Sequence, residues 1–354
     1  MLTNTPQCNL SEGSLLADDR FLRKVATFYH IEGKTQESIA GLMFCSRQTI
    51  SKALQKAEDR GIVRISVIPE ERAGYLSNLA RDLRFHLELE DLILVPGRSF
   101  DDSKPDTDIN EDVLGEITEA AAHYLDQVIT HHDILGVTGG RSIMRNIVRH
   151  LKPSKSLSDL QVVPTIGFVE RHTSIGDANL VAYDIAKLYG GGHAWLPIPA
   201  LVETREQQEQ ARTLPLVRDV FKMIEQANII IMGLWTPDLD HDMVKRGVLS
   251  EQQVQVLQGY HPVADINHWV FDAQGRSLNN MLHPPPYYLT GLEIPRLPER
   301  ISCQHTKVIL VAGASKARIP AIRAALKAGL ANVLITDHIT AQCLRAEVNA
   351  PEAT

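Results

Sequence analysis

The sequence predicts an α/β protein in which an N-terminal winged helix-turn-helix domain precedes a doubly wound, mostly parallel sheet. Two observations predict this fold class. Residues 19–67 have the periodicity of short amphipathic helices with almost no Gly or Pro, and from residue 91 onward short apolar runs alternate with segments of helical period. We therefore expect a helix-turn-helix domain over residues 19–68, a linker and connecting helix over 69–90, and the sheet domain over 91–349.

The composition excludes several classes of protein. Of the 354 residues, 44% are hydrophobic and 22% are charged, which is enough apolar material for a large core and too much for a disordered chain. No apolar run approaches the roughly 20 residues that cross a bilayer. The first 18 residues, expected to be a flexible arm, lack the pattern of a secretory signal. The net charge of −7 means that any contact with DNA must be local.

The cysteines indicate a cytoplasmic protein. Cys8, Cys45, Cys303 and Cys343 lie far apart and lack the spacing of a metal site or a disulfide framework, so we expect reduced thiols. No other pattern of ligands stands out, and we expect neither a metal nor another cofactor.

Three helices are expected near the N-terminus. The first covers residues 20–29, where large apolar side chains fall on one stripe. Thr35 is the predicted N-cap of the second helix, and Ser46 is that of the third, which runs to about Arg60. Residues 62–67 alternate in polarity and are expected to form the strand of a small β wing. Two helices joined by a tight turn after a leading helix are typical of a helix-turn-helix.

The third helix is the candidate DNA-reading element. A helix about 10–12 Å across fits the major groove, and the residues near its N-terminus then reach the base edges. The only charges between Ser46 and Lys56 are cations. The residues expected to contact DNA are Ser46, Arg47, Gln48, Thr49, Ser51, Lys52 and Lys56. The alternative is an ordinary solvated helix of a three-helix bundle, which the arrangement of capped turn and helix disfavours.

Phe44 occupies the turn position where such motifs usually have Gly. A left-handed backbone is favoured there, and it is easiest for a residue without a Cβ. The sequence therefore predicts either a turn of another geometry or a strained Phe44.

Beyond the linker, strands and helices are expected to alternate. A connecting helix with Tyr75, Leu79 and Leu83 on one stripe leads into the first strand, and an acidic loop over residues 100–110 follows that strand. The expected strands are 92–97, 133–137, 160–166, 194–197, 228–233, 306–311 and 332–336. The expected helices are 111–129, 142–151, 179–189, 216–227, 319–328 and one that begins near residue 340. This alternation indicates a parallel sheet covered on both faces.

Two loops that each follow a strand and precede a helix are candidate ligand sites, because open α/β sheets bind ligands beyond the carboxyl ends of their strands. The first loop has two Gly, two hydroxyls and a guanidinium at a helix N-terminus, which suits a phosphate, and the second has small residues and a Lys. Asp265 can accept hydrogen bonds from sugar hydroxyls. The candidate effector-binding residues are Thr138, Gly139, Gly140, Arg141, Ser142, Asp265, Gly313, Ala314, Ser315 and Lys316. The alternatives are a plain strand-to-helix turn, a solvated Lys and a turn-capping Asp.

The chain resembles the SorC family of sugar-responsive bacterial transcription regulators from about residue 20 to residue 346. The resemblance is carried by residues 33–67, 135–142 (LGVTGGRS), 263–275 (VADINHWVFDAQG) and 311–341. It implies a DNA-binding domain joined to an effector domain similar to sugar-phosphate isomerases and deaminases, generally in a homotetramer. This sequence departs from the family where Gly139-Gly140 replaces a common Trp-Gly pair and where Ala264 replaces a common Gly.

The resemblance also implies a function. The partners would be double-stranded operator DNA and a phosphorylated sugar or polyol, and the regulated genes would be those of a carbohydrate catabolic operon. Residues 138–142 and 313–316 would serve the phosphate, with Asp265 near the sugar. The second loop lacks the second Gly and the acidic residue that the family usually has before its Lys.

The alternative from another class is an enzyme, a sugar-phosphate isomerase or deaminase with a DNA-binding head. Such chemistry needs a general base, and the candidates Glu170, His172, Asp177 and Asp265 form no tight acid-base constellation. Residues 238–242 (DLDHD) suggest a metal site but lack the signature of a calcium loop. A sugar sensor that binds only proteins is disfavoured by the third helix. We expect a regulator rather than an enzyme.

Overall fold

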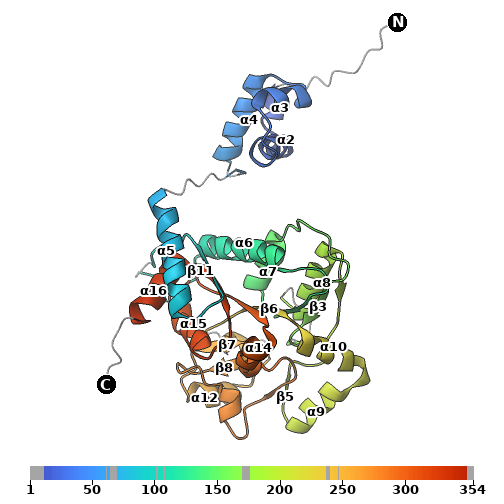
Figure 1. Ribbon diagram of the computed structural model, residues 1–354, viewed down its shortest axis with the longest axis vertical. Coiled ribbons are helices and arrows are strands. Elements are labelled where there is room, and N and C mark those ends of the chain that lie inside the picture. The colour runs from blue at the N-terminus through green and yellow to red at the C-terminus, as the bar shows by residue number, and fades with distance from the viewer. Residues whose placement is uncertain are drawn as a thin grey trace. The chain divides into compact units, whose positions relative to one another are not determined.

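The computed structural model describes residues 12–60, 62–63, 70–100, 103–106, 108–169, 176–236, 240–245 and 247–348. The chain divides into two units, Met1–Arg72 and Ala73–Thr354, each with its own hydrophobic core (Figure 1). The division falls within the stretch of residues 69–90 that is expected to contain the linker and the connecting helix.

The first unit is a small helical bundle. Its elements are α1 (Glu12–Leu15), α2 (Asp19–Ala26), the π-helical turn η1 (Thr27–Ile31), α3 (Gln36–Met43) and α4 (Arg47–Asp59). Phe21 and Leu22 of α2 pack with Ile39 of α3 and Ile50 of α4 in its core. Leu16 is buried in the same core, so the expectation of a flexible arm is wrong for the residues that form α1 and the turn after it.

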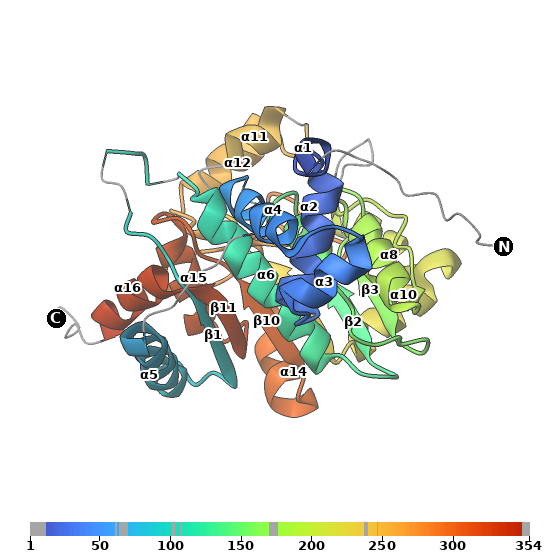
Figure 2. The same ribbon diagram turned by 90° about the horizontal axis from the view of Figure 1, so that it is seen from above.

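The helices α3 and α4 form the predicted helix-turn-helix (Figure 2). Thr35 caps α3 by accepting a hydrogen bond from the backbone N–H of Ser38 (3.2 Å), and Ser46 caps α4 by accepting one from that of Thr49 (3.1 Å). Phe44 ends α3 in the left-handed conformation, with φ 54° and ψ 41°. The turn therefore has the usual geometry, and Phe44 carries the strain.

Most of the predicted wing lies outside the described residues. Ile62 and Val63 both donate backbone hydrogen bonds to the carbonyl of Ala57, at 2.8 and 3.0 Å, and neither is in a strand. Residues 64–67 are not among those described.

The second unit is built on a seven-stranded parallel sheet. Its strands in chain order are β1 (Asp91–Val95), β2 (Ile134–Val137), β3 (Gln161–Pro164), β4 (Gly192–His193), β6 (Ile229–Gly233), β10 (Lys307–Val311) and β11 (Val333–Asp337). Across the sheet they lie in the order β1-β11-β10-β6-β2-β3-β4, and every neighbouring pair is parallel.

The expected strand over residues 194–197 is wrong in its position, because the strand lies slightly earlier in the chain. The structure places the edge strand β4 just before it, and Ala194 makes one further ladder bond to the carbonyl of Val162 (3.0 Å). The backbone N–H of Leu196 donates instead to the side chain of Asn179 (2.7 Å), and Pro197 has no N–H to donate. The ladder ends there for these reasons.

Helices cover both faces of the sheet, as predicted for a doubly wound fold. Alternate residues of β10 point to two separate cores. Ile309 and Val311 belong to the core that is closed by α6 (Glu111–Val128), α7 (Ile143–His150) and α8 (Ala178–Tyr189). Val308 and Leu310 belong to the core that is closed by α5 (Glu70–His86), α10 (Pro215–Gln226), α15 (Arg318–Lys327) and α16 (His338–Val348).

Several short elements are not predicted by the sequence analysis. They are β5 (Leu201–Val202), α9 (Arg205–Thr213), α11 (Asp240–Lys245), α12 (Glu251–Gln258), β7 (Ala264–Ile266), β8 (Trp269–Phe271), α13 (Leu278–Met281), β9 (Tyr288–Leu289), the 3-10 turn η3 (Ile294–Arg296) and α14 (Leu297–Gln304). The helix α9 buries no residue, so it has no apolar stripe by which to be found. No helix in the described part of the chain is long and apolar enough to cross a bilayer.

Candidate DNA-binding helix and ligand pocket

The side chains of α4 that are expected to contact DNA lie on its surface, with one exception. Those that are exposed are Ser46, Arg47, Gln48, Ser51, Lys52 and Lys56. Thr49 is only 5% exposed, and its hydroxyl lies 2.8 Å from Ser46 Oγ. The expectation that Thr49 faces outward is wrong, because this side chain is used within the N-terminal cap of α4.

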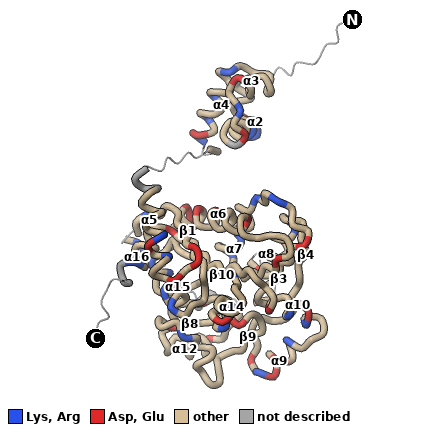
Figure 3. The backbone as a smooth tube through the Cα atoms, viewed as in Figure 1, with Lys and Arg blue, Asp and Glu red and all other residues tan. Residues whose placement is uncertain are grey.

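The exposed face of α4 is basic from Arg47 to Lys56, whereas Glu58 and Asp59 are exposed at its C-terminal end. Figure 3 marks the basic positions of this helix in blue. Arg47 Nε lies 4.0 Å from a carboxylate oxygen of Glu37 on α3, and both side chains are largely exposed. Such a pair is weak and can be exchanged for a phosphate oxygen. The arrangement suits a helix that holds the DNA backbone with cations and presents polar side chains to base edges.

The carboxyl edge of the sheet has a topological switch point between β2 and β6. From β2 the chain moves outward through β3 to β4, and from β6 it moves the other way through β10 to β11. Ligands of open α/β sheets bind outside the strand ends at such a point. Residues 138–142 follow β2 at the switch point, and residues 313–316 follow β10, the next strand beyond β6.

Two buried hydroxyls in the loop after β2 have no partner among the described residues. They are Thr138 Oγ1 and Ser142 Oγ. The loop is close to a neighbouring turn, since Gly140 N donates to the carbonyl of Gly176 (2.8 Å) and a Cβ at Gly139 would lie 2.8 Å from the same oxygen. A buried hydroxyl without a partner is costly, so this loop is suited to receive a polar ligand or water.

Asp265 lies beside the end of β6. Its backbone N–H donates to the carbonyl of Trp235 (3.0 Å) and its carbonyl accepts from the N–H of Trp235 (2.9 Å). Its Oδ1 accepts a hydrogen bond from the backbone N–H of His268 (2.8 Å), as in a turn-capping Asp, and burial raises the pKa of this carboxyl to about 7. Asn267 donates to Thr165 Oγ1 (3.1 Å), just after β3. The hairpin of β7 and β8 therefore brings Asp265 and Asn267 to the switch point.

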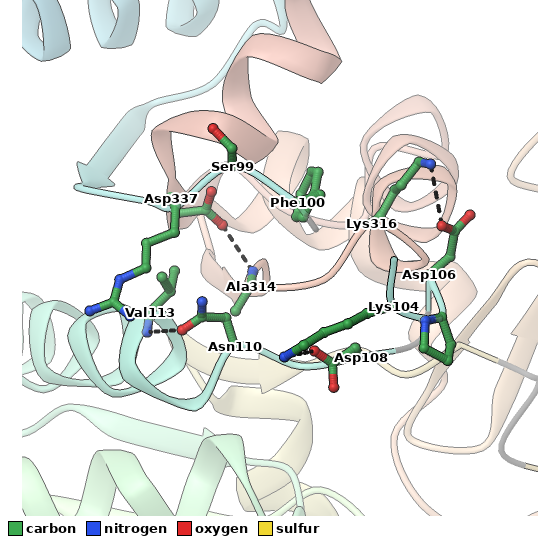
Figure 4. A pocket seen from close by; sticks show the side chains of 12 residues that line it. Ser99, Phe100, Lys104, Asp106, Asp108, Asn110, Val113, Ala314, Lys316 and Asp337 are labelled. Carbon is green, nitrogen blue, oxygen red and sulfur yellow. Dashed lines mark hydrogen bonds and ion pairs between the residues drawn. The ribbon is translucent and has the colours of Figure 1, made fainter. Parts of the chain in front are cut away.

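The loop after β10 borders a small, partly open pocket (Figure 4). Its lining residues are Arg98, Ser99, Phe100, Lys104, Pro105, Asp106, Asp108, Asn110, Val113, Ala314, Lys316 and Asp337. Three cations here each pair with an acid. The pairs are Lys316 with Asp106 (3.2 Å), Lys104 with Asp108 (3.1 Å) and Arg98 with Asp112 (3.1 Å). These side chains are largely exposed, so an anionic ligand can compete with the carboxylates for the cations.

The backbone of the loop after β10 is already hydrogen-bonded within the protein. Ala314 N donates to Asp337 Oδ2 (2.9 Å), and Ser315 Oγ donates to the carbonyl of Asp106 (2.9 Å). A Cβ at Gly313 would lie 2.6 Å from the carboxylate of Asp337, so this position requires Gly. Lys316 is consequently the side chain of this loop that is best placed to meet an anion in the pocket.

The pocket is lined both by candidate residues predicted from the sequence and by residues that were not predicted. Lys316 lies there with Arg98 and Lys104, which come from the segment after β1. The signal that could have found them is the presence of two cations in an otherwise acidic loop. Residues 138–142 and Asp265 are not part of the pocket lining, and Arg141 is exposed at the start of α7.

Three of the four residues considered for an enzyme, Glu170, His172 and Asp177, gain no support. Asp177 caps α8 by accepting a hydrogen bond from Asn179 N (2.8 Å), whereas Glu170 and His172 lie outside the described residues. Of residues 238–242, the first two are outside the described part and the others lie in α11. Among the described residues, no group of three or more His, Cys, Asp or Glu is placed to hold a metal ion.

Known proteins resemble this chain along nearly its whole length. It is 25% identical to the Deoxyribonucleoside regulator of Bacillus subtilis (strain 168) over 325 residues, which is 91% of this chain and 96% of that one. It is 24% identical to the Erythritol catabolism regulatory protein EryD of Brucella abortus (strain 2308) over 335 residues, 94% and 98% of the two chains. The family model Sugar-bind, described as "Putative sugar-binding domain", matches residues 72–345. The chain belongs to the SorC family of sugar-binding transcriptional regulators.

The SorC-family fold is confirmed by comparison with solved structures. The full-length Sorbitol Operon Regulator SorC from Klebsiella pneumoniae superposes with a TM-score of 0.70 at 21% identity, covering 92% of this chain and 99% of that one. The relatives are named as transcriptional regulators, so the expectation of a regulator rather than an enzyme is confirmed.

Proposed function

We propose that this SorC-family chain binds double-stranded operator DNA through α4 and regulates a carbohydrate catabolic operon in response to a phosphorylated sugar or polyol. The observation that carries the proposal is the carboxyl edge of the sheet, where a pocket lined by three cations and three carboxylates follows β1, β10 and β11, and a polar switch point follows β2 and β6. Cations suit a phosphate group, and hydroxyls and a carboxylate suit the hydroxyls of a sugar.

The spacing of the strands supports a ligand that spans both parts of this edge. The strands β2 and β10 both pair with β6, and neighbouring strands lie about 4.8 Å apart, so β2 and β10 run about 10 Å apart across the sheet. A phosphorylated sugar in an extended conformation reaches over this distance. We place its phosphate near Lys316 and its hydroxyls near Asp265 and the buried hydroxyls of Thr138 and Ser142.

The phosphate must replace an acidic side chain to reach Lys316. Asp106 now holds this Lys at 3.2 Å, and the backbone of Asp106 accepts hydrogen bonds from Ser315 Oγ and from the N–H of Ala317 (both 2.9 Å). Binding of a phosphate is therefore expected to shift the segment after β1. A ligand changes DNA binding only if it binds the DNA-competent and DNA-incompetent states unequally, and this segment is the element that we propose to differ between them.

The proposal includes a cytoplasmic homo-oligomer, a tetramer. One recognition helix reads only a few base pairs, whereas two helices related by a two-fold axis read a pseudo-palindromic site with half-sites about one DNA turn apart.

The other effector-binding candidates, Arg141 and the N-terminus of α7, offer a second place for negative charge beside β2.

A thermal-shift screen of sugar phosphates and polyol phosphates tests the effector site. A ligand that binds the native state at about 100 times its Kd stabilises it by about 2.7 kcal/mol, which raises the Tm by several degrees. We expect at least one phosphorylated compound to stabilise the full chain and its control variant Lys222→Ala, in which an exposed Lys on α10 is removed. Lys316→Ala and Arg141→Ala should reduce the shift, and a full shift in both variants would contradict the site.

A further inference from the structure

Phe44 is an exposed aromatic residue in a strained backbone conformation. The residue is 97% exposed, and its backbone φ is 54°. The residues on either side, Met43 and Cys45, pack against the core of the first unit, whereas Phe44 does not. Leu42, two residues earlier, is also 51% exposed.

The fold of the first unit does not require this ring. The backbone N–H of Phe44 caps α3 by donating to the carbonyl of Ala40, which a Gly in the same position would do without strain from a Cβ. The ring buries almost none of its own surface, so it adds little to the core. Its contribution must come from a contact that the isolated chain does not make.

The surroundings of Phe44 indicate what it contacts. It lies two residues before Ser46, the N-cap of α4, and is therefore close to the N-terminal end of α4, which is expected to reach the base edges. The exposed side chains that follow it include Arg47 and Lys52, which are suited to phosphate oxygens of a duplex. An aromatic ring next to cations and hydrogen-bond donors is suited to nucleic acid.

We propose that Phe44 is a DNA-contact residue whose ring packs against apolar groups of the duplex at the edge of the groove that α4 enters. These groups are thymine methyls and deoxyribose carbons. The inference rests on the proposed function, because it requires α4 to enter the groove. It adds a contact from the turn of the motif to those made by the recognition helix.

The experiment begins with a duplex that the full chain selects from a random DNA library. Binding of this duplex is then measured for the wild type, Phe44→Gly, Phe44→Leu and Arg47→Ala over a range of salt concentrations. We expect Phe44→Gly to weaken binding by about fivefold to tenfold, the lower part of the range for one base contact. Phe44→Leu, which keeps an apolar side chain, should lose less.

Two further readouts separate this role from a structural one. Because Phe44 releases no counterion, its loss should leave the salt dependence unchanged, whereas Arg47→Ala should make it less steep. The Tm of Phe44→Gly should equal or exceed that of the wild type, since Gly relieves the strain at φ 54°. Replacing thymine by uracil in the duplex identifies the group in contact. If the replacement weakens binding by the wild type but not by Phe44→Gly, the ring contacts a thymine methyl. If it does not weaken binding by the wild type, the ring contacts deoxyribose.

The possible failures are distinguishable. Unchanged affinity in Phe44→Gly with weakened binding in Arg47→Ala would overturn this inference alone. If the variant instead changed the oligomeric state in sedimentation with unchanged DNA affinity, the ring would be a contact with a second copy of the chain, and the inference would be wrong. A full chain that enriched no duplex would overturn the proposed function and this inference together.

Discussion

At the scale of single residues, Asp265 shows how burial changes the chemistry of a side chain. Its Oδ1 accepts one backbone hydrogen bond, from His268, and burial raises the pKa of the carboxyl to about 7. A carboxyl group that is partly protonated near neutral pH can donate a hydrogen bond as well as accept one. This suits the binding of a sugar hydroxyl, which also does both.

The raised pKa predicts the pH dependence of stability. The native state holds the proton of Asp265 more tightly than the unfolded chain, so this group stabilises the fold fully below pH 4 and the stabilisation is lost as the pH rises through about 7. Asp265→Asn cannot ionise and should show no such loss. Relative to the variant, the wild type should lose up to about 4 kcal/mol of unfolding free energy between pH 4 and pH 8.

Tryptophan fluorescence during urea unfolding measures this difference, because Trp195, Trp235 and Trp269 all lie in the second unit. Parallel pH profiles for the wild type and Asp265→Asn would contradict a buried, proton-binding Asp265.

The residue scale also shows what the sequence could and could not predict about the sites. Lys316 is recognisable from its place between a small-residue turn and a helix. Arg98 and Lys104 are marked in the sequence only as cations in an acidic segment, and their approach to Lys316 depends on β1 lying beside β11 at the edge of the sheet. At Phe44 the sequence left two geometries open. The structure has the strained one, since a left-handed residue costs only about 1–2 kcal/mol and Met43 and Cys45 pack into the core on either side.

At the scale of elements, the helices of the first unit were predictable because their signals are local. Thr35 and Ser46 cap α3 and α4 through hydrogen bonds within a few residues. The strand β4 and the helix α9 were not predictable from the sequence, because each depends on tertiary contacts. The side chain of Asn179 takes the N–H that would have extended β4, and α9 is held at its surface by Gln208 and Arg212 rather than by an apolar stripe.

The helix α4 carries a prediction at this scale. Arg47→Ala and Lys52→Ala should each weaken binding of the selected duplex by about fivefold to a hundredfold, because one contact with a base or a phosphate is lost. The helical circular dichroism and the oligomeric state should remain those of the wild type, since both side chains are exposed. Arg205→Ala, which removes an exposed Arg from α9 in the other unit, is the matched control. Equal binding by all three variants and the wild type would contradict the assignment of α4.

At the scale of the whole molecule, the order of the strands determines which loops can act together. Residues that are far apart in the sequence meet at one edge because β2 and β10 flank β6 and because β1 returns beside β11. The alternation of strands and helices predicted a parallel sheet, but it contains no information on the order of strands within it. The fold class was therefore predictable, whereas the division of the effector candidates between a switch point and a separate pocket lined by three cations and three carboxylates was not.

The proposed function requires that an anion at the carboxyl edge of the sheet control the affinity of α4, which belongs to the other unit, for DNA. The most direct measurement is the affinity of the full chain for its selected duplex with and without the stabilising sugar phosphate, for the wild type and Lys316→Ala. A coupling of about 1–3 kcal/mol, typical of allosteric proteins, would change the affinity of the wild type by about 5- to 150-fold. We predict that Lys316→Ala binds the duplex as the wild type does without ligand and that the sugar phosphate no longer changes its affinity. An undiminished response in Lys316→Ala, or no response in the wild type, would contradict the account.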